Sequence, residues 1–95
     1  MAILVDEITT YPLSRTRHLP GREWCHMVSD ESFEELHEMA ARLGIPRFVF
    51  QRDHYDLTPP YRDRAIALGA EPVSGLELAR RRVRSQEPRR RAGPR

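Results

Sequence analysis

The sequence places an imidazole and a carboxylate two residues apart, in His54-Tyr55-Asp56, shortly after the apolar run 47–50. On an extended chain, side chains at i and i+2 point to the same face, with Cα atoms about 6.5–7 Å apart. His54 and Asp56 are therefore candidate catalytic residues: they can share a metal ion, or Asp56 can orient His54 as a general base. The structural alternative is that Asp56 or Thr58 caps the next helix while His54 bonds a backbone carbonyl. An H-x-D spacing is common in sequences, so by itself it supports the hypothesis of a site and does not identify one.

Other catalytic motifs do not fit the sequence. His37-Glu38 lacks the second histidine of the H-E-x-x-H zinc motif, because Ala41 occupies that position. A Gly-rich phosphate loop, a nucleophile elbow and a C-x-x-C pair are all missing from the sequence. Cys25 as a nucleophile would need a nearby base, and on a strand the neighbouring His26 points to the opposite face. A buried structural cysteine is the simpler interpretation.

Short apolar or β-branched runs predict the strands that must position these residues, at 2–5, 24–28, 48–50 and 71–73. The segment 8–22 lacks periodicity and predicts a long loop. A capping-box spacing of Ser32 and Glu35 predicts a helix over 32–43 that Gly44 terminates. Similar signals predict helices that begin near residues 58 and 74.

This order, β-β-α-β-α-β-α, predicts an α/β fold with a small, mostly parallel sheet of about four strands and three helices. We expect one domain over residues 1–84 and a disordered, Arg-rich tail over 85–95. In open parallel sheets, ligands bind beyond the carboxyl ends of the strands. The predicted site is therefore a polar rim made of Asp6, His26, Gln51, His54 and Asp56.

Charge is unevenly distributed along the 95 residues. Residues 80–95 contain eight arginines against one acid, whereas residues 1–79 contain eight arginines and thirteen acids. The segment Arg80–Arg95 could bind nucleic acid or an acidic partner, or it could be a solvated terminus. A single cysteine allows no internal disulfide, and neither a signal peptide nor a membrane span is recognisable. These features predict a cytoplasmic protein that is not bound to a membrane.

Several segments together resemble a family. They are VDE at 5–7, WCHM at 24–27, EELHEMAARLG at 34–44, RFVFQ at 47–51, HYDL at 54–57 and RAIALGAEPV at 64–73. The set is similar to a bacterial and bacteriophage domain-of-unknown-function family, number 4031. The resemblance implies a stand-alone cytoplasmic protein and supplies no activity. The motif positions that it implies are Asp6, His26, Asp30, His37, Gln51, His54, Tyr55 and Asp56.

Two functional hypotheses follow, and the sequence does not decide whether the protein is an enzyme. In the first, Asp6, His54 and Asp56 hold a divalent metal in a hydrolase-like pocket, with phosphoester hydrolysis as the first reaction to test. In the second, the protein is a non-catalytic binding module. The histidines and Asp56 then form a structural hydrogen-bond network, and the Arg80–Arg95 segment contacts nucleic acid or an acidic protein. Further candidate positions for a ligand-binding or structural network are Asp6, His26, Asp30, His37, Gln51 and Tyr55.

Overall fold

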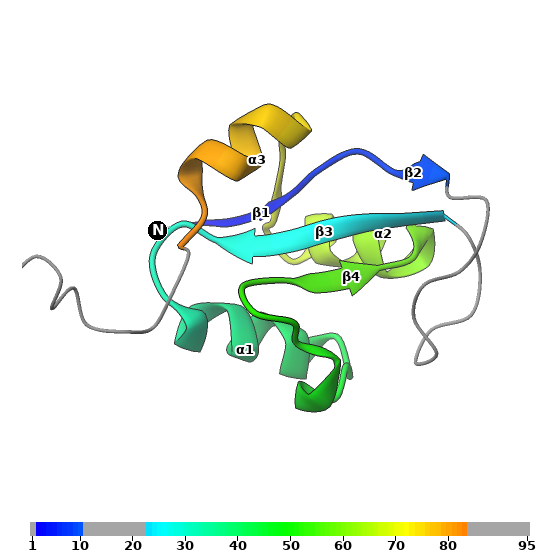
Figure 1. Cartoon of the computed structure of the whole chain (residues 1–95). Coiled ribbons are helices and arrows are strands. Elements are labelled where there is room, and N and C mark those ends of the chain that lie inside the picture. The colour runs from blue at the N-terminus through cyan, green and yellow to red at the C-terminus, as the bar shows by residue number, and fades with distance from the viewer. Residues whose placement is uncertain (1, 11–22, 84–95) are drawn as a thin grey trace, which may run out of the picture.

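A computed structural model describes residues 2–10 and 23–83 of the chain (Figure 1). In chain order the elements are β1 (Ile3–Val5), β2 (Thr9–Thr10), β3 (Glu23–Ser29), α1 (Phe33–Arg42), the 3₁₀ helix η1 (Arg47–Val49), β4 (Tyr55–Leu57), α2 (Pro59–Ala67), β5 (Glu71–Pro72) and α3 (Gly75–Arg81). The predicted mixed α/β class with three helices is confirmed. Most of the predicted loop 8–22 and the predicted tail 85–95 lie outside the described residues.

The five-stranded sheet is mostly antiparallel, so the predicted parallel arrangement is wrong. β3 is the central strand, and β1, β2 and β4 all pair with it in antiparallel orientation. Only β5 is parallel to its neighbour, β1. Alternation of strands and helices misled the prediction because it does not determine which strands become neighbours. With antiparallel neighbours, the carboxyl ends of the strands do not share one rim.

The register of β1 and β2 along β3 contains one extra residue. Val5 lies opposite Met27 and Thr9 lies opposite Trp24, so the three residues 6–8 span the same stretch as the two residues 25–26. One extra residue on one strand of an antiparallel pair is the mark of a β-bulge, which redirects side chains and often occurs beside functional sites. Here the irregular stretch begins at Asp6.

The run at 47–50, predicted as a strand, instead begins with the 3₁₀ helix η1. In this helix Val49 is buried, whereas Phe48 is 68% exposed. The strand forms a few residues later, as β4, after a turn in which Arg52 adopts a left-handed conformation with φ of 57°. His54 and Asp56 therefore belong to the strand region itself and do not follow it.

The helix boundaries follow the predicted signals closely. Ser32 Oγ accepts a hydrogen bond from Glu35 N at 3.0 Å, and Gly44 has a φ of 78° just after α1. Ser74 Oγ likewise accepts from Glu77 N at 3.1 Å at the start of α3. These caps satisfy backbone donors that a helix start leaves without partners.

The two faces of the sheet are covered differently. The main core lies on the side of α1 and α2, where alternate strand residues such as Val5, Met27 and Tyr55 are fully or almost fully buried. On the other face, Leu4 and Val28 pack against Leu78 of the short helix α3. Figure 1 shows α3 and α1 on opposite sides of the strands. The α3 face thus has a small apolar patch, and polar side chains lie beside it.

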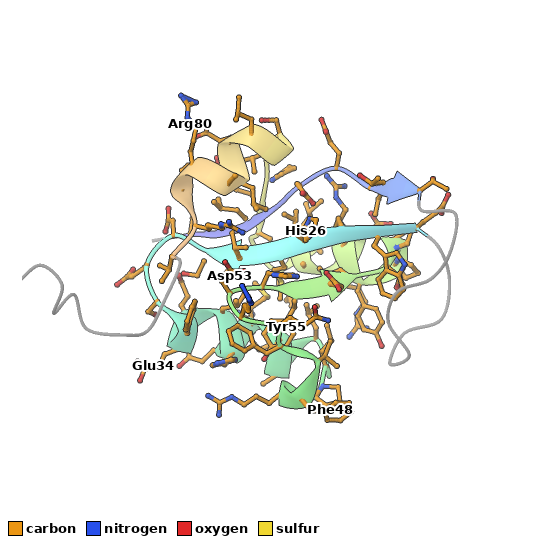
Figure 2. All side chains as sticks on the ribbon, in the orientation of Figure 1. His26, Glu34, Phe48, Asp53, Tyr55 and Arg80 are labelled. Atoms are coloured by element: carbon orange, nitrogen blue, oxygen red, sulfur yellow. The ribbon has the colours of Figure 1, made fainter. Side chains whose placement is uncertain are left out.

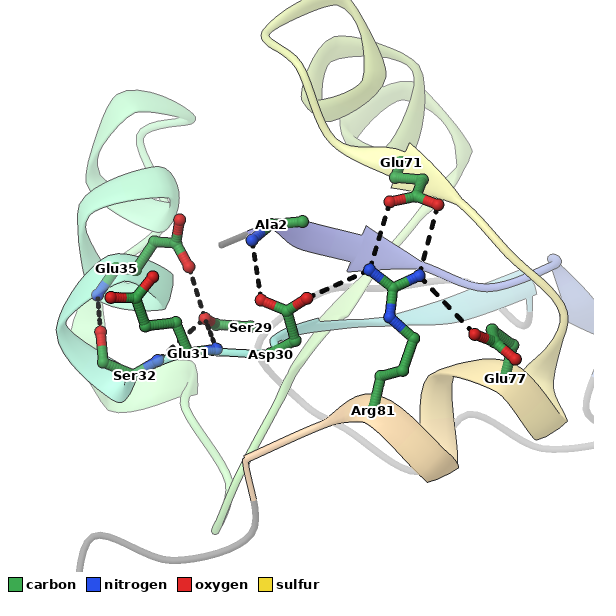
Figure 3. Close-up of polar contacts among 9 residues, drawn as sticks. All are labelled: Ala2, Ser29, Asp30, Glu31, Ser32, Glu35, Glu71, Glu77 and Arg81. Carbon is green, nitrogen blue, oxygen red and sulfur yellow. Dashed lines mark hydrogen bonds and ion pairs between the residues drawn. The ribbon is translucent and has the colours of Figure 1, made fainter.

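A polar network fixes α3 to the end of the sheet (Figure 3). Asp30 accepts a hydrogen bond from Ala2 N at 2.8 Å and pairs with Arg81 at 3.1 Å. The same guanidinium contacts Glu71 at 3.3 Å and Glu77 at 3.7 Å. Burial alone would raise the pKa of Asp30, but hydrogen bonds from Ala2 and Arg81 lower it overall. Asp30 therefore helps to dock a helix and lies apart from the histidines described next.

Candidate functional site

Four polar side chains meet on the α3 face of the sheet. His26 of β3 lies directly opposite Asp56 of β4 in the antiparallel register. His54 precedes Asp56 by two residues and points to the same face. Asp6, at the end of β1, reaches His26 from the other neighbouring strand. Strand pairing, and not a rim of parallel strand ends, brings together these four predicted residues.

Asp6 holds His26 through both carboxylate oxygens. Oδ1 accepts the backbone N–H of His26 at 2.7 Å, and Oδ2 lies 2.9 Å from Nδ1 of its ring. A carboxylate only accepts hydrogen bonds, so Nδ1 carries a proton, and in the neutral form of the ring Nε2 keeps its lone pair. Asp6 is only 8% exposed, whereas the side chain of His26 is 40% exposed. The buried carboxylate thus fixes the tautomer of a partly accessible imidazole.

His54 lies between two carboxylates. Its Nδ1 is 2.9 Å from Oδ1 of Asp53, and its Nε2 is 3.3 Å from Oδ1 of Asp56. Burial alone would lower the pKa of His54, but the bonds to Asp56 and Asp53 outweigh it, so the pKa is raised. The two imidazole rings approach edge to face, with centroids 5.1 Å apart.

These side chains include one group with the composition of a metal site. One ligand atom from each of His26, His54 and Asp56 can be chosen such that all three lie within 4.8 Å of one another. All three residues are partly buried. Imidazole and carboxylate are ligands for Zn²⁺ and for other first-row transition metals.

The other predicted positions lie elsewhere. His37 Nδ1 is 2.8 Å from the hydroxyl of Tyr55, on the α1 side of the sheet, and burial lowers the pKa of His37. Figure 2 shows Tyr55 on the α1 side of β4, with Asp53 and His26 nearer to β3. Gln51 is exposed and joins the turn through its backbone, with its N–H 2.9 Å from the carbonyl oxygen of His54.

Two residues near the cluster were missed by the sequence analysis. Asp53 orients His54, and its other oxygen lies 3.3 Å from NH1 of Arg82. Asp53 could have been noticed as part of an Asp-His-x-Asp run. Arg82 is hidden in the arginine-rich segment, where nothing in the sequence separates a pocket residue from a tail residue.

The cysteine does not contribute a nucleophile to this site. Cys25 alternates with His26 along β3 and faces the main core, where it is almost fully buried. Burial, with a further contribution from Asp6, raises the pKa of its thiol to about 12. The thiol therefore stays protonated at neutral pH, in agreement with the structural interpretation.

Comparisons with known proteins agree with the resemblance seen in the sequence. The model of a family described as "Protein of unknown function (DUF4031)" matches residues 3–85. The match spans most of the chain, so the chain belongs to this family. No curated protein and no solved structure matches the chain. Within residues 2–10 and 23–83, no helix has the length and apolar character needed to cross a membrane.

Proposed function

We propose that this DUF4031 protein binds a divalent transition-metal ion through His26, His54 and Asp56. The observation that carries the proposal is the convergence of three ligand atoms within 4.8 Å, contributed by two paired strands. Two histidines and one carboxylate are also the ligand set of several catalytic zinc and iron centres.

One distance within the set is compatible with coordination of a metal ion. Two ligands on a tetrahedral zinc ion, with bonds of about 2.1 Å, lie roughly 3.4 Å apart. His54 Nε2 and Asp56 Oδ1 are separated by 3.3 Å. His26 would supply the third ligand atom of the set. Its Nε2 is the available ligand atom, because Asp6 bonds Nδ1.

Each proposed histidine ligand is supported by a second carboxylate. Asp6 binds Nδ1 of His26, and Asp53 binds Nδ1 of His54. Metal-bound histidines usually donate their other ring N–H to a carboxylate or carbonyl, which fixes the ring and makes the ligand nitrogen more basic. The pairing of both rings in the same way supports a metal site over a chance meeting of polar side chains.

Three protein ligands leave a coordination position for water or substrate. A metal in such a position supplies a hydroxide at neutral pH and polarises a bound oxygen. We therefore extend the proposal to metal-dependent hydrolysis, with a phosphoester as the first substrate to test. Asp6 and Asp53 would act as positioning residues, since each bonds Nδ1 of a proposed histidine ligand and neither belongs to the proposed ligand set.

The second candidate is a non-catalytic module in which these residues form a structural network. One observation favours it: both ring nitrogens of His54 already face carboxylates. Most of the Arg80–Arg95 segment, the candidate contact for nucleic acid or an acidic partner, lies outside the described residues. Within the described part, Arg80 and Arg81 are paired with acids of the chain itself.

Metal content and thermal shift of the purified protein distinguish these two functions. Zn²⁺, Mn²⁺, Mg²⁺ and Ni²⁺ are added to wild type, His54→Ala and Asp56→Asn. A ligand at a hundred times its Kd stabilises the folded state by about 2.7 kcal/mol. For a domain of this size that corresponds to a Tm increase of roughly 10–20 °C.

The expected result is a metal-specific Tm increase that both variants lose. His37→Ala is the matched control, because it removes a histidine from the opposite face and should keep the shift. If no metal shifts the wild type and both site variants melt well below it, the residues form a structural network and the metal proposal is wrong.

A further inference from the structure

A pocket of about 200 Å³ lies between α3 and the histidine cluster. Asp6, His26 and His54 line it on the sheet side, Val28 and Leu78 provide apolar surface, and Arg82 at the end of α3 contributes a guanidinium. Pockets for drug-sized ligands measure about 300–1,000 Å³. The volume therefore favours a ligand of only a few heavy atoms beside the proposed metal.

Arg82 has hydrogen-bonding capacity that its protein contacts do not use. NH1 contacts Asp53, but Nε is buried and has no hydrogen-bond partner among the described residues. A buried donor without a partner costs about 1–3 kcal/mol, so such groups call for an explanation. Arg82 lines the pocket, and guanidinium groups can bind phosphate in a side-on, two-bond manner. An oxyanion in the pocket would satisfy Nε once the side chain turns to expose this atom, which the protein covers in the present structure.

We infer that the pocket binds the phosphoryl group of a small phosphate ester, with Arg82 contacting its oxygens. This inference rests on the proposed function, because it assigns the substrate class of the same metal site. The guanidinium would hold one side of the phosphoryl group while another oxygen reaches the open metal position. In hydrolysis a water oxygen bonds to phosphorus, the ester P–O bond breaks, and the alcohol leaves with one proton of that water.

The local charges make phosphate binding depend on the metal. With both histidines neutral, as metal ligands are, Asp6, Asp53 and Asp56 carry three negative charges. Arg82 and Arg62, whose Nε donates to the backbone carbonyl of Asp6 at 2.7 Å, carry two positive charges, so the sum is −1. A bound divalent ion brings this sum to +1. An anion therefore meets a net negative charge when the metal is absent and a net positive charge, with two cationic contacts, when it is present.

The test measures metal and phosphate binding separately by titration calorimetry. Metal binding is measured first, and inorganic phosphate is then titrated into metal-free and metal-loaded protein. The variants are Arg82→Ala and Arg82→Lys, with Arg80→Ala as the control because Arg80 is exposed and, among the described residues, pairs with the nearby Glu77. Lysine keeps a positive charge near Asp53 but lacks the planar set of N–H donors of a guanidinium. Arg82→Lys therefore distinguishes the effect of the charge from the effect of a two-bond contact to phosphate.

We expect phosphate to bind only the metal-loaded protein. Arg82→Ala should weaken phosphate binding at least tenfold and Arg82→Lys to an intermediate degree, while Arg80→Ala binds as wild type and all four proteins bind metal within threefold of one another. Metal binding with no phosphate binding, or with equal phosphate affinity in Arg82→Ala, overturns the inference and leaves the metal site intact. Failure of the wild type to bind any metal rejects both proposals.

Discussion

Asp6→Asn is the change that best separates a metal site from a general polar network. Asp6 accepts two hydrogen bonds from one residue, the backbone N–H and the ring Nδ1–H of His26. An asparagine side chain has one accepting oxygen and one donating NH₂ group. If the asparagine oxygen accepts from the backbone N–H of His26, its NH₂ group faces Nδ1 of the ring. Nδ1 must then accept a hydrogen bond from that NH₂ group. The ring proton moves to Nε2, the nitrogen that the proposed metal requires.

The alternative orientation of asparagine places its NH₂ group against the backbone N–H of His26. Two donors then face each other in a buried position, at a cost of about 1–3 kcal/mol. The first orientation keeps both hydrogen bonds, so the metal-free fold should lose little stability. Loss of a carboxylate behind a histidine ligand typically weakens metal binding 10–100-fold. This range corresponds to about 1.4–2.8 kcal/mol.

The assay is a competitive metal titration against a chromogenic chelator, combined with urea unfolding of the metal-free proteins. Asp63→Asn is the matched control, because it makes the same charge change at an exposed position on α2. We expect a 10–100-fold weaker Kd for Asp6→Asn and a Kd within threefold of wild type for Asp63→Asn. Equal metal affinity in Asp6→Asn and wild type would refute the tautomer argument.

Two further predictions concern the neighbouring contacts. The bonds to Asp56 and Asp53 raise the pKa of His54 in the folded protein above its unfolded value of about 6.5. The metal-free protein should therefore have its full extra stability below that unfolded value and lose it as the pH rises through the folded pKa. Urea unfolding at several pH values, with a chelator present, should show this loss, and Asp53→Asn should make the pH dependence smaller. Tyr55→Phe should lower the free energy of unfolding by about 0.5–1.5 kcal/mol, because the hydrogen bond to His37 is lost, and it should leave the metal Kd unchanged. A weaker metal Kd in this variant would show that the two faces of the sheet are coupled.

The helices were predictable because their signals are local. Ser32 with Glu35 and Ser74 with Glu77 form the expected caps, and glycines follow α1 and α2 with positive φ. Each signal depends on residues within one turn of helix, and no distant contact is needed to interpret it.

Strand pairing was not predictable in the same way. An isolated run such as 24–28 shows that a strand exists, but its neighbours depend on contacts far apart in the chain, such as His26 with Asp56. The residues of the candidate site likewise divide into those that local spacing identifies and those that the fold alone brings together. His54 and Asp56 were singled out from local spacing, whereas the link of Asp6 to His26 depends on the antiparallel register, and Arg82 reaches the pocket only because α3 folds back over the sheet.

β4 has consequences for how a metal and the fold would depend on each other. It contributes three residues, each paired with β3, and through Asp56 and the adjacent His54 it carries two of the three proposed ligands. A shift of this strand by one position would turn both ligands toward the main core and expose Tyr55 and Leu57. A bound ion would therefore act as a cross-link that selects the native register. Metal binding would then add to the stability of the folded chain as well as complete the proposed site.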